Sequence, residues 1–114
     1  MNPVIEAIKK RRSVRSYDPK PIPKDIINAI IEAGNQAPSA MNSQPWRFVV
    51  VEDKTLKKKL LNAAFPNAKK ILEHVKDADP ERYKTIMKRY EEMEDPIYYS
   101  APAILFVIGS GRYA

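Results

Sequence analysis

Apolar residues recur at helical spacing in several parts of this chain, and the residues that flank them predict where each helix begins and ends. Asn2 and Pro3 suit an N-cap and a first helical turn, and the helix that follows should end near Arg12. A second helix is predicted over residues 26–34, where isoleucines lie three and four positions apart. Glycine commonly ends helices, so we expect this helix to stop at Gly34.

The middle of the chain predicts further helices. Asp53 is expected to cap a third helix, which is built on three leucines between residues 56 and 61. A further helical stretch is expected over residues 68–76. Asp79-Pro80 opens another helix, which Pro96 is expected to stop.

Two continuous apolar runs, residues 48–51 and 103–108, predict strands that are covered on both faces. Residues 35–46 are predicted to form a loop, and three prolines extend the connector at residues 19–23. Two strands alone make a poor sheet, so a partner chain or further sequence should complete it. The end of the chain, which follows directly after the second strand, resembles interior sequence. We therefore expect residues 1–114 to be one α+β domain and an incomplete N-terminal portion of it.

Composition narrows the possible chemistry. The chain has 114 residues, with 20 Lys and Arg against 14 Asp and Glu, and its net charge of +6 favours anionic partners such as phosphates, nucleic acid or anionic lipid. The lysine runs at residues 57–59 and 69–70 are interpreted as solvated helix faces. The absence of cysteine excludes disulfides, thiolate metal sites and cysteine nucleophiles, so redox chemistry would need a bound cofactor.

Several other classes of protein are disfavoured. An acidic residue falls early, at Glu6, and the longest apolar run is too short to span a bilayer, so we expect a cytoplasmic protein without membrane contact. Aromatic residues do not alternate with the basic ones, which disfavours nucleic-acid binding. His74, the only histidine, is expected at the surface rather than in a metal site. Tyr98 and Tyr99 could line a substrate pocket, although core packing is the favoured role.

Residues 11–15 form a basic run, Arg-Arg-Ser-Val-Arg, just past the first predicted helix. The planar guanidinium group of arginine matches phosphate oxygens, and the hydroxyl of Ser13 adds a small donor. If the chain is extended here, Ser13 and Arg15 point to the same side. The alternative is a solvated, arginine-rich helix end that interacts favourably with the helix dipole.

Residues 38–46, Pro-Ser-Ala-Met-Asn-Ser-Gln-Pro-Trp, form a polar loop that ends in the only tryptophan. Its hydroxyls and amides donate and accept without charge, which suits a heteroaromatic ring or the hydroxyls of a sugar-like chain. The alternative is a connector whose amides satisfy its own backbone. Trp46 is expected to be a core or interface anchor.

At this separation, the basic run and the polar loop together resemble the N-terminal half of the nitroreductase family of flavin-dependent oxidoreductases. The resemblance rests on Arg11-Arg12-Ser13-Val14-Arg15, Ala33-Gly34, Ala37-Pro38-Ser39-Ala40, Asn42, Gln44-Pro45-Trp46, Phe48-Val49-Val50 and Ala101-Pro102-Ala103. It covers most of residues 1–53 and about 97–109, whereas the middle of the chain matches only as helices. The family fold implies three α/β/α layers, with a mixed sheet that a C-terminal half and a homodimer partner complete.

The resemblance also implies an activity: ping-pong hydride transfer from NAD(P)H, through FMN at a homodimer interface, to a nitroaromatic, quinone or similar small acceptor. By position, Arg11 and Ser13 would hold the FMN phosphate and ribityl region with help from Arg12, and Arg15 would lie near the N1 and O2 edge of the ring. The other subunit would supply the polar loop, with the cofactor-binding residues Pro38, Ser39, Ala40, Asn42 and Gln44, and Gln44 would also support the loop.

The flavin carries the chemistry in this family, so the resemblance implies neither a catalytic side chain nor a metal. The second half of family members supplies a further basic residue for the phosphate and the backbone that faces flavin N5, and this sequence contains neither. Two alternatives remain open on the same fold. One is another flavin reaction, such as dehalogenation or flavin destruction, and the other is flavin binding or storage without turnover.

Overall fold

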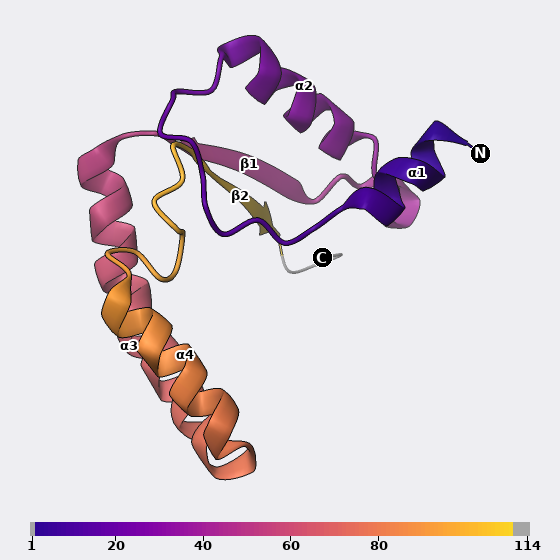
Figure 1. Ribbon diagram of the computed structural model, residues 1–114. Coiled ribbons are helices and arrows are strands. Elements are labelled where there is room, and N and C mark those ends of the chain that lie inside the picture. The colour runs from indigo at the N-terminus through magenta and orange to yellow at the C-terminus, as the bar shows by residue number, and fades with distance from the viewer. Residues whose placement is uncertain (1, 111–114) are drawn as a thin grey trace.

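The computed structural model describes residues 2–110, which form four α-helices, a 3₁₀ helix and a two-stranded sheet (Figure 1). In chain order the elements are α1 (Pro3–Lys10), α2 (Lys24–Asn35), the 3₁₀ helix η1 (Ala40–Asn42), β1 (Trp46–Val51), α3 (Lys54–Ala78), α4 (Pro80–Glu92) and β2 (Ile104–Gly109). No helix in this part of the chain is long and apolar enough to cross a membrane. The prediction that the chain ends in interior sequence concerns residues 111–114, which lie outside the described range.

Two of the three predicted N-caps are confirmed by their hydrogen bonds. The side chain of Asn2 accepts from the backbone N–H of Val4 at 2.8 Å, and Asp79 accepts from that of Arg82 at 3.1 Å. Asp53 occupies the N-cap of α3 as predicted, but its side chain makes no capping hydrogen bond. The position of this predicted cap is therefore confirmed, but the predicted hydrogen bond from the helix to its side chain is not formed.

Helix α1 ends two residues earlier than predicted. Arg11 is its C-cap, with ψ 136°, and the Arg11 N–H donates to the carbonyls of Ala7 and Ile8. The chain leaves α1 at the start of the basic run, so all of residues 12–15 lies outside the helix. This exit makes the whole basic run accessible.

The prediction of two separate helices between residues 54 and 76 is wrong, because α3 is continuous through Pro66. Proline lacks the N–H that would bond one turn back, and this loss disfavours a helix interior. Packing against α4 on both sides of the proline compensates. Phe65 lies 5.7 Å from Tyr90 between ring centroids, and Leu72 is buried. Contact with α4 therefore fixes the length of α3.

The strands β1 and β2 pair antiparallel, with Val51 opposite Ile104 and Trp46 opposite Gly109. Exposure alternates along β1, so the prediction that both faces are covered is wrong within residues 2–110. The mixed sheet would need strands beyond these two, and it stays a prediction.

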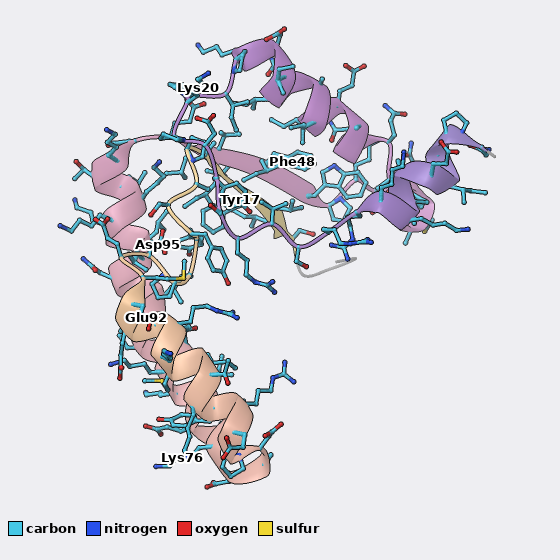
Figure 2. The ribbon with its side chains drawn as sticks, in the orientation of Figure 1. Tyr17, Lys20, Phe48, Lys76, Glu92 and Asp95 are labelled. Atoms are coloured by element: carbon cyan, nitrogen blue, oxygen red, sulfur yellow. The ribbon has the colours of Figure 1, made fainter. Side chains whose placement is uncertain are left out.

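Helix α2 covers one face of β1 (Figures 1 and 2). Gly34 does not end this helix, which continues to Asn35. A Cβ atom at Gly34 would lie 3.2 Å from the ring of Phe48, closer than ordinary van der Waals contact. The glycine therefore permits close packing of the helix on the strand rather than a helix stop.

Helices α3 and α4 form an antiparallel hairpin that extends away from the sheet, with Lys76 near its far end (Figures 1 and 2). Only Val51 and Leu72 are buried among the large apolar side chains of the described chain. The accessible surface is 9425 Å², whereas a compact monomer of 13.0 kDa is expected to expose about 6,300 Å². The chain thus leaves much apolar surface uncovered.

A turn between α4 and β2 ends α4 at Glu92, earlier than the predicted stop at Pro96. The carboxylate of Asp95 accepts the backbone N–H groups of Ile97, Tyr98 and Ser100 at 3.0, 2.8 and 3.1 Å. These hydrogen bonds hold the chain in a compact turn that leads into β2.

Candidate functional site

The basic run is an exposed, extended segment that follows α1 and belongs to no sheet. Within residues 2–110, segment 12–22 takes part in no backbone–backbone hydrogen bond, and the arginines at 11, 12 and 15 form no ion pair. Three cations without neighbouring acids attract anions, so the position of the run suits a phosphate ligand.

Arg12 differs from the other two arginines of the run. Its Nη1 donates to the carbonyls of Lys9 at 3.1 Å and Arg11 at 2.9 Å. These are carbonyls at the C-terminal end of α1, which lack partners in the helix itself. Arg12 is therefore folded back onto the helix end. The run thus combines a cation at the helix end, in Arg12, with two arginines that can still bind a phosphate, Arg11 and Arg15.

The polar loop has an unusual backbone. Met41, Asn42 and Gln44 have positive φ angles of 54°, 53° and 46°. Residues other than glycine adopt this left-handed region at a cost, and such conformations cluster at functional sites. The loop also exposes 92% of Met41, so its tip projects an apolar side chain into solvent.

Hydrogen bonds within the loop hold this conformation. Ser39 Oγ accepts from the Gln44 N–H at 3.0 Å, and the Gln44 side-chain amide donates to Asn42 Oδ1 at 2.9 Å. Gln44 therefore supports the loop, as the family resemblance implies. The hydroxyl hydrogen of Ser39 and the NH₂ group of Asn42 remain as donors to a ligand. Both would face acceptor atoms such as ring carbonyls.

The ends of the polar loop are tied to the rest of the fold. Trp46 Nε1 donates to Asn35 Oδ1 at 2.8 Å, which joins the end of α2 to the start of β1. The Ser110 N–H donates to the Pro45 carbonyl at 2.9 Å. Trp46 is thus an anchor, as predicted, and it fixes where the loop begins its return to the sheet.

An open hollow of about 450 Å³ lies between the polar loop and the end of β2. Its walls are formed by Pro38, Ser39, Ala40, Pro45, Trp46, Val107 and Gly109. Small-molecule pockets usually have volumes of about 300–1,000 Å³ and apolar walls with a few polar groups. Three of the predicted cofactor-binding residues therefore share one hollow of suitable size.

The basic run does not line this hollow, and no hydrogen bond between described residues joins the run to the loop. Their meeting at one cofactor across a subunit interface stays a prediction, as do the individual roles of the residues.

Two residues near the site were missed or misread from the sequence. Tyr17 lines two hollows of about 340 and 280 Å³, one with Pro102 and the other with Tyr98. Its position two residues past Arg15 in an extended segment was the available signal. Lys57 was interpreted as solvated, but it is partly buried and its Nζ donates to the carbonyls of Ala101 and Pro102 at 3.0 and 3.1 Å. No local pattern predicts that contact.

The two tyrosines before β2 are partly buried. The Tyr98 ring meets Phe106 edge-on, and both Tyr98 and Tyr99 line the smaller hollow beside Tyr17, so packing and pocket lining occur together.

Burial, and then the proximity of Tyr99, raise the pKa of the Tyr90 hydroxyl. Tyr90 is accordingly neutral at physiological pH.

His74 lies on α3 far from the polar loop, in an exposed position as predicted. It borders a hollow of about 470 Å³ between α3 and α4, together with Ile71 and Arg82. The described residues contain no group of three or more histidine, cysteine, aspartate or glutamate side chains that could hold a metal ion.

The fold and the site define an α+β protein that presents an exposed cationic strand and a hydrogen-bonding loop, features suited to a heteroaromatic ligand that carries a phosphate. The model of the Nitroreductase family matches residues 8–114. The chain belongs to the nitroreductase family, which confirms the resemblance drawn from its motifs.

Individual relatives agree with this assignment. A Thermus thermophilus protein named NADH dehydrogenase is 41% identical over 88 residues, which are 77% of this chain and 38% of the relative. The structure of a Bacteroides fragilis nitroreductase with bound FMN aligns with a TM-score of 0.63 at 36% identity, over 94% of this chain and 52% of that one. The structure of an iodotyrosine deiodinase bound to FMN and 3-iodo-L-tyrosine aligns with a TM-score of 0.76 at 27% identity, over 97% and 59%. The chain thus spans about two fifths to three fifths of the length of these relatives.

Proposed function

We propose that the protein is an FMN-dependent oxidoreductase that transfers hydride from NAD(P)H to a small organic acceptor such as a nitroaromatic or a quinone. One observation carries the proposal: a chain of the nitroreductase family combines an unpaired cationic strand with a polar loop that has free hydrogen-bond donors. A cytoplasmic location is part of the proposal.

The residues present suit FMN. An FMN phosphate is an anion, and Arg11 and Ser13 offer it a guanidinium group and a hydroxyl from an exposed strand. Ser39 and Asn42 offer neutral donors, which match the ring carbonyls of a flavin. Arg15 would lie near the N1 and O2 edge of the ring, where a cation favours the anionic reduced form.

The chemistry of the proposed reaction belongs to the cofactor: when bound, FMN accepts hydride from NAD(P)H and passes it to the acceptor in two separate half-reactions at one site. The residues of this chain would bind and orient the cofactor. The left-handed backbone at Met41 and Asn42 holds the loop donors before any ligand arrives. Such preorganisation reduces the ordering cost of binding.

We further propose that the cofactor lies at a homodimer interface, where one subunit supplies the basic run and the other the polar loop. The basic run and the polar loop of one chain share no hollow and no hydrogen bond among the described residues, which supports this arrangement. The large exposed surface supports it as well, since exposed apolar side chains occur on α1, α2 and both strands.

The direct test is a flavin assay on the purified protein. We expect a yellow protein whose flavin absorbance is bleached by NADH or NADPH without oxygen and restored by a nitroaromatic or quinone. A protein that stays colourless after incubation with FMN contradicts the proposal. A yellow protein that neither nucleotide bleaches points instead to flavin storage.

Reductive dehalogenation is the second candidate, because the deiodinase structure aligns with 97% of the chain at a TM-score of 0.76. A carbon–iodine bond of the substrate would become a carbon–hydrogen bond, with two electrons from the reduced flavin and one proton, and iodide would leave. Measurement of iodide release from 3-iodo-L-tyrosine by the reduced protein separates this reaction from nitro or quinone reduction.

A further inference from the structure

Two side chains turn back onto the backbone at either end of the basic run. Arg12 Nη1 donates to the carbonyls of Lys9 and Arg11, at 3.1 and 2.9 Å. The Tyr17 hydroxyl donates to the Val14 carbonyl at 2.9 Å. Segment 12–22 takes part in no backbone–backbone hydrogen bond within residues 2–110. The hydrogen bonds of these two side chains are therefore the local restraints on the basic run, and the only other one in the segment, from the Lys20 N–H to Asp18 Oδ1 at 2.9 Å, lies beyond it.

We propose that Arg12 and Tyr17 are positioning residues that hold Arg11, Ser13 and Arg15 ready for a phosphate-bearing flavin. The inference rests on the proposed function. It also revises the role that the family resemblance implies for Arg12. Instead of contacting the phosphate, Arg12 would restrain the backbone beside the residues that do, and we call such a restraint a brace.

At the first end of the run, the Arg12 side chain caps the C-terminal end of α1. The carbonyls at the end of a helix lack intrahelical partners, and a cation is favourable there. Arg12 satisfies two such carbonyls from one nitrogen, and this fixes the direction in which the chain leaves α1. Arg11 and Ser13 flank Arg12 directly, so their directions follow from that exit.

The brace at the second end attaches the run to the body of the protein. Tyr17 is 44% exposed and lines two hollows, both of which are also bordered by Ala101 and Ala103. The ring thus packs near the segment that enters β2, while its hydroxyl holds the Val14 carbonyl. An extended strand with both ends held loses less conformational freedom when it binds a ligand.

Glutamine at position 12 separates positioning from charge. Its amide keeps a hydrogen-bond donor on a shorter side chain at this position but carries no charge. We expect Arg12→Ala to raise the FMN dissociation constant on the order of fivefold, the effect of one exposed hydrogen bond, and R12Q to stay within about twofold of wild type. The matched controls are R11A and R11Q, which should weaken FMN binding equally because both remove the same charge.

The opposite result at position 12 would overturn the proposal. If R12Q weakens binding as much as Arg12→Ala, and both reduce the dependence of FMN affinity on salt, then Arg12 acts on the phosphate through its charge. Salt dependence that is unchanged in R12Q supports a role in positioning.

Tyr17→Phe removes one hydroxyl and keeps the ring. Carbonyl ¹³C and backbone ¹⁵N NMR of the flavin-free chain should show an upfield shift at Val14 and faster internal motion over residues 13–16. An unchanged carbonyl shift and unchanged mobility contradict the brace at Tyr17. This readout needs no flavin, so failure of wild type to bind FMN refutes the proposed function while the NMR result still decides the brace.

Discussion

At the scale of single residues, Arg11 is more available to a ligand than its neighbour Arg12. Its guanidinium makes no hydrogen bond to residues 2–110, whereas that of Arg12 is bonded to the end of α1. Arg11→Ala should weaken FMN binding on the order of tenfold or more, since it removes a charge-assisted hydrogen bond. Isothermal titration should show that riboflavin, which lacks the phosphate, binds wild type and the variant equally. Equal weakening for both flavins would mean that Arg11 does not contact the phosphate.

Arg15 should affect the reduction potential of the flavin rather than its retention. A cation near N1 stabilises the anionic reduced flavin more than the neutral oxidised one. Arg15→Ala should therefore lower the two-electron midpoint potential by about 30–60 mV, which corresponds to one charge-assisted hydrogen bond. Spectroelectrochemical titration measures this shift. An unchanged potential with FMN still bound would remove Arg15 from the ring edge.

The chemistry of single residues could be predicted from the sequence better than their directions. The sequence predicted that Trp46 anchors the loop and that Gln44 supports it, and each side chain makes a hydrogen bond of that kind. The contacts of Arg12 and Lys57 with backbone carbonyls were not. A long cationic side chain bonds whichever carbonyls the fold brings near it, and for Lys57 those lie more than 40 residues away.

At the scale of elements, the turn before β2 depends on one carboxylate. Asp95 accepts three backbone N–H groups, and Tyr99 and Ser100 adopt positive φ angles of 56° and 54° beside it. Lys57 binds the next two carbonyls along the chain, those of Ala101 and Pro102. The entry into β2 is therefore held by these two side chains together with two backbone hydrogen bonds, from the Tyr99 N–H to the Asp95 carbonyl and from the Ala101 N–H to the Tyr98 carbonyl.

Loss of this carboxylate should destabilise the fold. Asp95→Ala leaves three backbone donors without their acceptor, and we expect the free energy of unfolding to fall by about 2–3 kcal/mol in urea titrations. Asp95→Asn keeps one oxygen and should cost less. Glu94→Ala is the matched control, because Glu94 is exposed and should change stability by less than about 0.5 kcal/mol. Equal stability of Asp95→Ala and the control would show that the turn is held by other contacts.

Element types and N-caps followed from local sequence, whereas element lengths depended on packing. The caps at Asn2 and Asp79 are local interactions and could be predicted. The continuity of α3 through Pro66 could not, because contacts with α4 on both sides of the proline stabilise it. The apolar runs predicted the strands, but which faces are covered depends on neighbours that lie outside these two strands.

At the scale of the whole molecule, the exposed area sets the expectation for assembly. The excess over a compact monomer is about 3,000 Å², more than a standard protein–protein interface buries. The radius of gyration, 17.3 Å, likewise exceeds the roughly 13 Å of a compact domain of this length. The molecule therefore has both the surface and the shape to pack against further polypeptide.

Shared sites can be tested with two binding-deficient variants expressed together. One lacks Arg11 and Arg15, and the other lacks Ser39 and Asn42. Each homodimer should bind little FMN, but a mixed dimer contains one intact pair of motifs and should bind about half the wild-type amount. Absorbance of the purified mixed dimer, tagged differently on each chain, measures the recovery. Mixed dimers that form but recover no flavin, or a flavin-loaded monomer in sedimentation, would contradict a site shared between subunits.

The pairing of Val51 with Ile104 has a kinetic consequence, because 52 residues separate these two strand ends along the chain. Closing so long a loop from a disordered chain is slow and carries an entropic cost that grows with loop length. Helices α3 and α4 are local and lie within that interval, so their association can shorten the effective loop before the strands meet. We therefore expect the sheet to form after the α3–α4 hairpin. The packing of the buried Leu72 should then influence the rate at which β1 pairs with β2.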